Sequence, residues 1–235
     1  MRFRTIACSV VAFAFLPACF ALFSLDDYGP PIAEIDATSE ASDAPVDVDT
    51  GPPKRIVFLT SALYAGSSLK SAADADAICA ELATSAQLPG KFHAWTSDAV
   101  SAPASRIPAL AAVYMSFDAG IDAALGDLGP PLELLDGKLV ATDYFDLVRS
   151  GPRNGIIVTE KQTTIDASVQ RCEDVTIVWT NTTRLGMRGG ADCDNWTNPI
   201  ENGRAGIVGS ADAQNWTDAC GKQCSTPGRL ICFQE

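Results

Sequence analysis

The pattern of apolar and polar positions divides most of the chain into short elements, the first of which begins near residue 55. Residues 55–60, Arg-Ile-Val-Phe-Leu-Thr, are rich in strand-forming side chains and predict a buried strand. Apolar residues then recur at helical spacing, so we predict a helix that Ser71 caps and that stops before Pro89 and Gly90. The expected buried face of this helix consists of Ala72, Ala75, Cys79, Leu82 and Ala86.

Beyond this helix the pattern predicts mostly strands and turns. Asp136-Gly137 stands between two apolar runs and is a strong hairpin signal. The predicted elements are strands at 92–97, 132–135, 138–141, 176–180 and 228–233 and a short helix at 142–149. Asn, Gly, Thr and Trp are frequent between Cys193 and Cys224, where we expect loops and short strands.

The first residues carry a different pattern. Arg2 and Arg4 precede an apolar stretch at 6–15, which is too short to span a bilayer and has the length of a secretory signal. The stretch leads into Leu-Pro-Ala-Cys19, which resembles the lipobox of bacterial lipoproteins, a family that prefers a small residue where Pro17 stands. The resemblance implies that Cys19 is lipidated and becomes the first residue of the mature chain.

Two details of this segment bear on location. Phe20 follows the cysteine where an aspartate would retain the protein at the inner membrane, so the family's sorting rule implies the outer membrane. The alternative is an ordinary signal that is cleaved after Ala21, which would leave a secreted protein.

Charge restricts the partners of the chain. The 235 residues include 17 basic and 29 acidic side chains, for a net charge of −12. Such a chain lacks the basic face that nucleic acids require, and it does not dock electrostatically on anionic lipid. We therefore expect no nucleic-acid partner, and membrane contact through the lipid anchor only.

The charge is concentrated in a tail. Residues 20–53 contain eight acidic residues and no Lys or Arg, and Ala, Ser, Thr and Pro make up much of the remainder. This composition predicts an extended, disordered tether. The predicted organisation is a signal peptide at 1–18, the lipidated cysteine and acidic tether at 19–53, and a globular domain at 54–235.

Cysteine usage agrees with export. Cys8 leaves with the signal and Cys19 carries the lipid, so six of the eight cysteines remain in the domain. An even number in an exported chain predicts three disulfides, whose pairing the spacing alone leaves open. The alternative is a metal site that uses Cys220 and Cys224, which the presence of a single histidine, His93, disfavours.

Several motifs occur in a recognisable order. They are Gly-Lys-Phe-His-Ala-Trp-Thr-Ser at 90–97, the hairpin at 132–139 with its following helix, Val-Trp-Thr at 178–180, Cys-Asp-Asn-Trp at 193–196, and the spacing of the last two cysteines. Residues 55–235 thereby resemble the C-type-lectin-like fold, and most closely its endostatin-like branch, as in uncharacterised bacterial surface lipoproteins. The resemblance implies an α+β domain with two helices, mixed antiparallel strands and long loops, stabilised by disulfides.

The same resemblance implies a disulfide pairing. In that branch the helix cysteine joins the last strand, and the second cysteine joins the penultimate one. Transferred to this chain, the bridges are Cys79–Cys232 and Cys193–Cys224, and Cys172–Cys220 remains as an additional bridge.

Lectins of this fold bind sugar through calcium, and part of their signature is present. Glu201, Asn202, Asn215 and Asp218 could supply four oxygen ligands. Thr217 stands where the family has a ligand amide, so we expect no cofactor and at most weak calcium binding. The alternative interpretation is that the tryptophans of this loop pack in the core while its Asn and Asp residues form turns.

No catalytic motif is convincing. Ser67 and Lys70 fit the Ser-x-x-Lys pattern of serine acylases, but no partner motif follows, and phosphate-loop, dinucleotide and zinc-protease motifs do not occur. We therefore expect a protein that is not an enzyme.

The sequence predicts a lipid-anchored protein of the cell envelope that displays a non-catalytic binding domain for a protein or glycan ligand. Residues 194–218 are the expected contact loop, since loops on a rigid scaffold commonly carry binding. Its candidate ligand contacts are Asn195, Trp196, Asn198, Glu201, Asn202, Asn215, Trp216 and Asp218. The alternatives are an envelope protein with a structural or assembly role and no discrete ligand, and a calcium-dependent carbohydrate-binding lectin.

Overall fold

The structure is a computed structural model that describes residues 53–118 and 129–235. These residues belong to one unit of the chain, Val48–Glu235. The expected signal peptide, Cys19 and nearly all of the acidic tether lie outside the described residues. No helix within the described ranges has the length and apolar character needed to cross a membrane.

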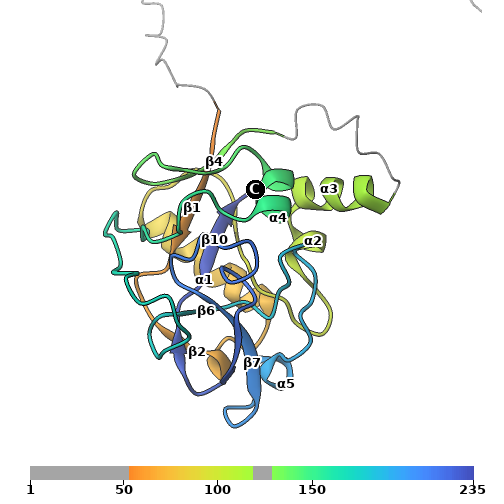
Figure 1. Ribbon diagram of the computed structural model, residues 1–235, viewed down its shortest axis with the longest axis vertical. Coiled ribbons are helices and arrows are strands. Elements are labelled where there is room, and N and C mark those ends of the chain that lie inside the picture. Colours follow the sequence, from red (N-terminus) through yellow and green to blue (C-terminus); the bar gives the residue numbers. More distant parts are fainter. Residues whose placement is uncertain (1–52, 119–128) are drawn as a thin grey trace, which may run out of the picture. The chain divides into compact units, whose positions relative to one another are not determined.

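A five-stranded sheet forms the centre of the unit (Figure 1). β1 (Arg55–Leu59) pairs antiparallel with β10 (Ile231–Gln234) and parallel with β4 (Leu132–Leu134). β3 (Phe92–Ala94) and β5 (Leu139–Ala141) lie at the edges, in the order β3-β10-β1-β4-β5. The last strand of the domain therefore lies beside the first, and the predicted hairpin at Asp136-Gly137 joins β4 to β5.

Two smaller sheets complete the strand content. β6 (Ile177–Trp179), β7 (Asn202–Ile207) and β8 (Cys220–Gln223) form an antiparallel sheet with β7 in its middle. β2 (Tyr64–Ala65) pairs with β9 (Pro227–Gly228). With six residues, β7 is the longest strand in the described ranges, although the polar sequence of this region predicted mainly loops.

The two predicted helices are present, and Ser71 caps the first of them as expected. α1 (Ala72–Ser85) begins at Ser71, whose side chain accepts a hydrogen bond from the Asp74 amide. α4 (Tyr144–Ser150) begins at Asp143 and ends at Gly151, whose φ of 79° favours glycine.

The expectation of two helices needs a correction, because the described residues contain five. The additional ones are α2 (Pro103–Arg106), α3 (Pro108–Asp118) and α5 (Cys193–Trp196). α3 lacks a clean apolar stripe: Leu110 and Val113 are buried, whereas Tyr114 and Met115 are exposed. A helix with apolar residues on both faces gives no helical period in the sequence.

Alternate residues of β1 face two separate cores. Val57 and Leu59 pack on the side of α3 and α4, whereas Ile56 and Phe58 pack on the side of α1. The tryptophans divide in the same way. Trp95 and Trp216 lie in the first core and Trp179 and Trp196 in the second, all at most 1% exposed. The central sheet is thus covered on both faces, which gives an α+β domain.

Three disulfides connect these elements. They are Cys79–Cys232, Cys172–Cys220 and Cys193–Cys224, which are the pairs that the resemblance implies. The first closes a loop of 153 residues, for which chain entropy gives a stabilisation of about 5 kcal/mol. It joins α1 to the strand that lies between β1 and β3.

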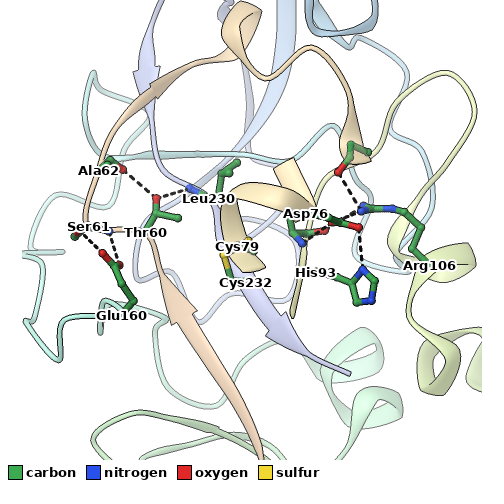
Figure 2. The surroundings of a disulfide bond; sticks show 12 residues. Thr60, Ser61, Ala62, Asp76, Cys79, His93, Arg106, Glu160, Leu230 and Cys232 are labelled. Carbon is green, nitrogen blue, oxygen red and sulfur yellow. Dashed lines mark hydrogen bonds and ion pairs between the residues drawn. A yellow bond between two sulfur atoms is a disulfide. The ribbon is translucent and has the colours of Figure 1, made fainter. Parts of the chain in front are cut away.

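A charge cluster lies beside this disulfide (Figure 2). Asp76 of α1 accepts hydrogen bonds from Arg106 of α2, from the Ala94 amide at 2.8 Å and from His93 Nδ1 at 2.8 Å. The second ring nitrogen of His93 lies 3.2 Å from Glu235 Oε2. Three elements of the domain, together with Glu235 just after β10, therefore meet at one carboxylate and one imidazole.

The cluster shifts both pKa values away from their usual ranges. The hydrogen bond to Asp76 raises the pKa of His93, against its burial, and Glu235 adds to the rise. Burial alone would raise the pKa of Asp76, but its bonds to His93 and Arg106 outweigh burial and lower it. The cluster is therefore most stable as an ion pair between imidazolium and carboxylate.

We predict that this cluster makes stability fall on the alkaline side. The interactions that raise the His93 pKa stabilise the fold fully below about pH 6.5, and this contribution is lost as the pH rises through the folded-state pKa. The interactions that lower the Asp76 pKa stabilise the fold above about pH 4, and that contribution is lost on acidification. Thermal unfolding of His93→Gln should show about 2 kcal/mol lower stability near pH 6 and a smaller decline towards pH 9.

Lys138→Gln is the control for this prediction, because the Lys138 side chain is 57% exposed and pairs with Asp136 in the β4–β5 turn, outside the cluster. It should shift the melting temperature only slightly. An unchanged alkaline decline in His93→Gln would contradict the assignment of that decline to His93.

Candidate functional site

The predicted contact loop does not present its tryptophans to solvent. The Trp196 indole donates to Ser97 O at 2.9 Å within the core, and Trp216 packs on Trp95 with ring centroids 5.0 Å apart. The prediction that Trp196 and Trp216 contact a ligand is therefore corrected, because both side chains are buried. Their burial agrees with the alternative interpretation of this loop, because a large aromatic side chain on a small domain is more stable inside than at its surface.

The asparagines of the loop make local bonds. Asn195 Oδ1 accepts from the Ala99 amide at 3.1 Å, which connects α5 to the segment that follows β3. Asn198 Oδ1 accepts from the Ile200 amide at 3.2 Å in a turn. Both side chains thus have a structural role in the loop.

The four expected calcium ligands are spread along β7. Asn202 is its first residue and Glu201 directly precedes it. The Asn215 carbonyl accepts a hydrogen bond from the amide of Ile207, which is the last residue of β7. These ends are about 16 Å apart for a strand of this length. Asp218 lies between them and is bonded to the Arg204 guanidinium and to Gln214. The four residues therefore do not converge on one ion.

An acidic hollow does form near Glu201 and Asn202, together with Asp192 and Asp194. Asp192 is already engaged, because it pairs with Arg188 at 2.9 Å and accepts from the Asn195 amide. Within residues 53–118 and 129–235, no group of three His, Cys, Asp or Glu side chains is arranged to hold a metal ion. Glu201 lines this hollow and Asp218 does not, so the two weak calcium candidates do not share a site there.

A different surface carries two adjoining hollows, which share Tyr114 of α3. The polar-edged hollow has a volume of about 320 Å³ and lies among residues 98–102, Ala104, Ser105, Tyr114, Met187 and Arg188. The apolar hollow has a volume of about 300 Å³ and is lined by Leu110, Val113, Tyr114, Val148, Arg184 and Leu185. We call the two hollows together the α3 face. Helices α2, α3 and α4, which supply part of its lining, lie close together in Figure 1.

The turn at 182–188 positions one wall of this face. Thr182 and Arg188 form a bridge, and the Thr183 amide donates to Met187 O at 2.8 Å. Gly186 has a φ of 75°, and a Cβ there would lie 2.7 Å from Leu110 Cδ2. Glycine at this position therefore lets the turn pack directly on α3, which brings Arg184 and Leu185 over the apolar hollow.

Asp98 holds the opposite wall. Its side chain, in a residue only 3% exposed, accepts from the backbone amides of Ala72, Val100 and Ser101 at 2.7–2.9 Å. Burial would raise the pKa of Asp98, but these amide donors outweigh it and lower the pKa. The carboxylate thereby fixes the segment that carries Val100.

Large apolar side chains are unusually exposed here. Val100 is 90% exposed, Met115 66%, Tyr114 42% and Leu185 40%. Three of these four residues line the two hollows, and Met115 follows Tyr114 in α3. Exposed apolar side chains that gather around a concavity are typical of interaction sites.

The sequence analysis missed this surface for a physical reason. Its residues come from three separate parts of the chain, namely the continuous stretch from residue 98 through α2 to α3, then α4, and then the 182–188 turn. The only local signal is the apolar run at 108–115, which has more apolar residues than one helix face can bury.

The serine acylase pattern lies elsewhere: Ser67 lies in the short 3₁₀ helix Gly66–Ser68, and Lys70 is exposed.

Comparison with known proteins adds no family name. No protein-family model matches the chain, and no curated protein matches it. The likeness to the endostatin-like branch therefore remains a prediction from the motifs described above.

We predict that Asp218 has a structural role that is independent of calcium. The Asp218 side chain is 9% exposed and its partner Arg204 is 38% exposed, so Asp218→Ala should lower stability by about 1–3 kcal/mol. The loss should be equal with calcium and with a chelator, as measured by thermal unfolding. Glu201→Gln, at an exposed site, is the matched control and should leave the melting temperature unchanged. A calcium-induced rise in melting temperature that either variant abolishes would contradict this assignment.

Proposed function

We propose that this chain is a lipid-anchored protein of the cell envelope whose domain recognises a protein ligand and does no chemistry. The observation that carries the proposal is the α3 face, where two hollows share Tyr114 and exposed apolar side chains surround them. Protein interfaces are built around such apolar centres with a polar and arginine-containing rim.

A protein ligand fits this surface better than a glycan. Sugars are held by many directional hydrogen bonds, whereas four side chains of the apolar hollow are purely aliphatic: Leu110, Val113, Val148 and Leu185. Calcium-dependent sugar binding is the less supported alternative, because Glu201, Asn202, Asn215 and Asp218 do not meet. A purely structural role in the envelope is also less supported, because it does not account for the two hollows that share Tyr114.

We also propose that the domain has the C-type-lectin-like fold in its endostatin-like form. The disulfide from α1 to the last strand supports this, as does the Cys193–Cys224 bridge beneath the loops. Pairing of β1 with β10 brings the two ends of the domain together. Such a scaffold leaves its loops and the α3 face available for binding.

Lipid anchoring is the part of the proposal that rests on Cys19. Full-length protein should incorporate a radiolabelled fatty acid during growth, and Cys19→Ala should lose the label, because several acyl chains on one cysteine give stable anchoring. Cys8→Ala is the matched control and should retain full labelling. Equal labelling of wild type and Cys19→Ala would contradict lipidation at Cys19, and secretion of an unlabelled wild-type chain would support the ordinary signal peptide instead.

Protein recognition is tested by placing a photo-crosslinking amino acid at Met115 of the full-length chain in cells. We expect a discrete adduct with a protein, and Leu185→Asp in the same chain should abolish it by placing a charge in the apolar hollow. The control position is Val175, which is 47% exposed and lies outside the α3 face. Adducts that form equally from both positions, or saturable binding on a glycan array without any Met115 adduct, would overturn the proposal.

A further inference from the structure

One cation of the α3 face has an unusual environment. The Arg184 guanidinium donates to the carbonyl of Arg149 at 3.0 Å, at the carboxyl end of α4. This contact holds the side chain across the rim of the apolar hollow, where the residue is half-buried beside Val148 and Leu185. Only Nη1 is used in this contact, so the fork of Arg184 retains further donors.

Arg184 differs from the other arginines that link loops in this domain. Arg106 pairs with Asp76, Arg188 with Asp192 and Arg204 with Asp218. In the part of the chain that the structure describes, no carboxylate lies within ion-pair distance of Arg184. A guanidinium in apolar surroundings gains most from a charged partner, because water screens it poorly there.

The other charges of the face are balanced. Arg188 borders the polar-edged hollow but pairs with Asp192, and the Asp98 carboxylate lines the same hollow. Residues 54–235 contain 15 basic and 21 acidic side chains, so the domain as a whole repels acidic molecules. Arg184, at the rim of the apolar hollow, is therefore a local exception with a defined position.

The apolar hollow beside Arg184 has the lining and the size to take an apolar side chain. Its floor consists of Leu110, Val113 and Val148, each at most 1% exposed, and Tyr114 and Leu185 form its edge. A volume of about 300 Å³ is at the lower limit of ligand pockets and suits one or two apolar side chains. An apolar group seated there would lie directly beside the free donors of Arg184.

We propose that the α3 face binds an acidic segment of its protein ligand, with one Leu- or Phe-sized side chain in the apolar hollow and an adjacent Asp or Glu carboxylate on Arg184. The proposal rests on the proposed function, since it names the chemistry of that same protein ligand. The carboxylate forms a charge-assisted, two-bond contact with the guanidinium, and the apolar side chain excludes water from it.

The test uses the full-length chain, immobilised, and a displayed library of random heptapeptides. Wild type should enrich peptides in which Leu or Phe stands next to Asp or Glu, and Arg184→Gln should lose this enrichment. A capped peptide of the enriched sequence should then bind Arg184→Gln about tenfold more weakly or worse, as measured by fluorescence anisotropy. Its amide analogue, with Gln and Asn in place of Glu and Asp, should bind wild type and Arg184→Gln equally.

Arg171→Gln is the matched control, because Arg171 is also an arginine but is 77% exposed and pairs with Glu173 away from the α3 face. It should retain wild-type affinity, and Arg184→Lys should restore only part of the loss, because an ammonium cannot form the two-bond contact. Melting temperatures identify any variant that fails to fold. The methyl resonances of Val113 and Val148 should shift when the peptide is added.

Three outcomes would overturn the inference: enriched peptides without acidic residues, equal losses in Arg184→Gln and Arg171→Gln, or no enrichment by wild type. A discrete Met115 adduct together with any of these would refute the acidic segment and leave protein recognition standing. Absence of both the adduct and the enrichment would refute the proposed function as well.

Discussion

The covalent link between Cys79 and Cys232 is the constraint on which the rest of the domain depends. It fixes α1 against β10, and β10 lies between β1 and β3 in the central sheet. Both sulfur-bearing residues are fully buried, and they lie in the same core as Phe58 and Phe92. Because the link closes 153 residues, every element between α1 and β10 folds within a closed loop.

The charge cluster around Asp76 acts together with this link. Asp76 lies three residues before Cys79 in α1, so the helix that carries the disulfide also carries the carboxylate for Arg106 and His93. Arg106 in turn donates to the carbonyls of Ala94 and Thr96, which connects α2 to the end of β3. One buried network thus positions α2, and α3 follows α2 directly. The α3 face is in this way placed by interactions on the far side of the sheet from its own core.

Burial also explains where binding residues are found. The indoles of Trp95, Trp179, Trp196 and Trp216 fill the interior, since a domain of this size needs their apolar area for its own stability. Trp179 occupies a slot between Gly66 and Gly228, where any Cβ would come within about 3 Å of the ring. The proposed recognition therefore uses exposed side chains on α3 and the 182–188 turn, and Arg184 at their edge.

The sequence by itself determined the local elements whose cause is local. Ser71 caps α1 because its side chain reaches the Asp74 amide three residues ahead, and Asp136-Gly137 turns the hairpin because glycine accepts a positive φ. The even number of domain cysteines in a chain expected to be exported also predicted disulfides, although it did not predict their pairing. Position in the chain could not reveal that β7 pairs on both sides, because strand pairing is a contact between distant segments.

Only the tertiary structure decided where the candidate site lies. A tryptophan beside asparagines looks the same in sequence whether its indole faces a ligand or the core, and Trp196 and Trp216 face the core. Asp218 offers the same oxygens to calcium and to a guanidinium, and the proximity of Arg204 selects the guanidinium. The α3 face joins Leu110, Val148 and Arg184 from three segments, so no motif contains it. Side-chain chemistry can be read from a sequence, whereas the choice of partner depends on which distant residues the fold brings close.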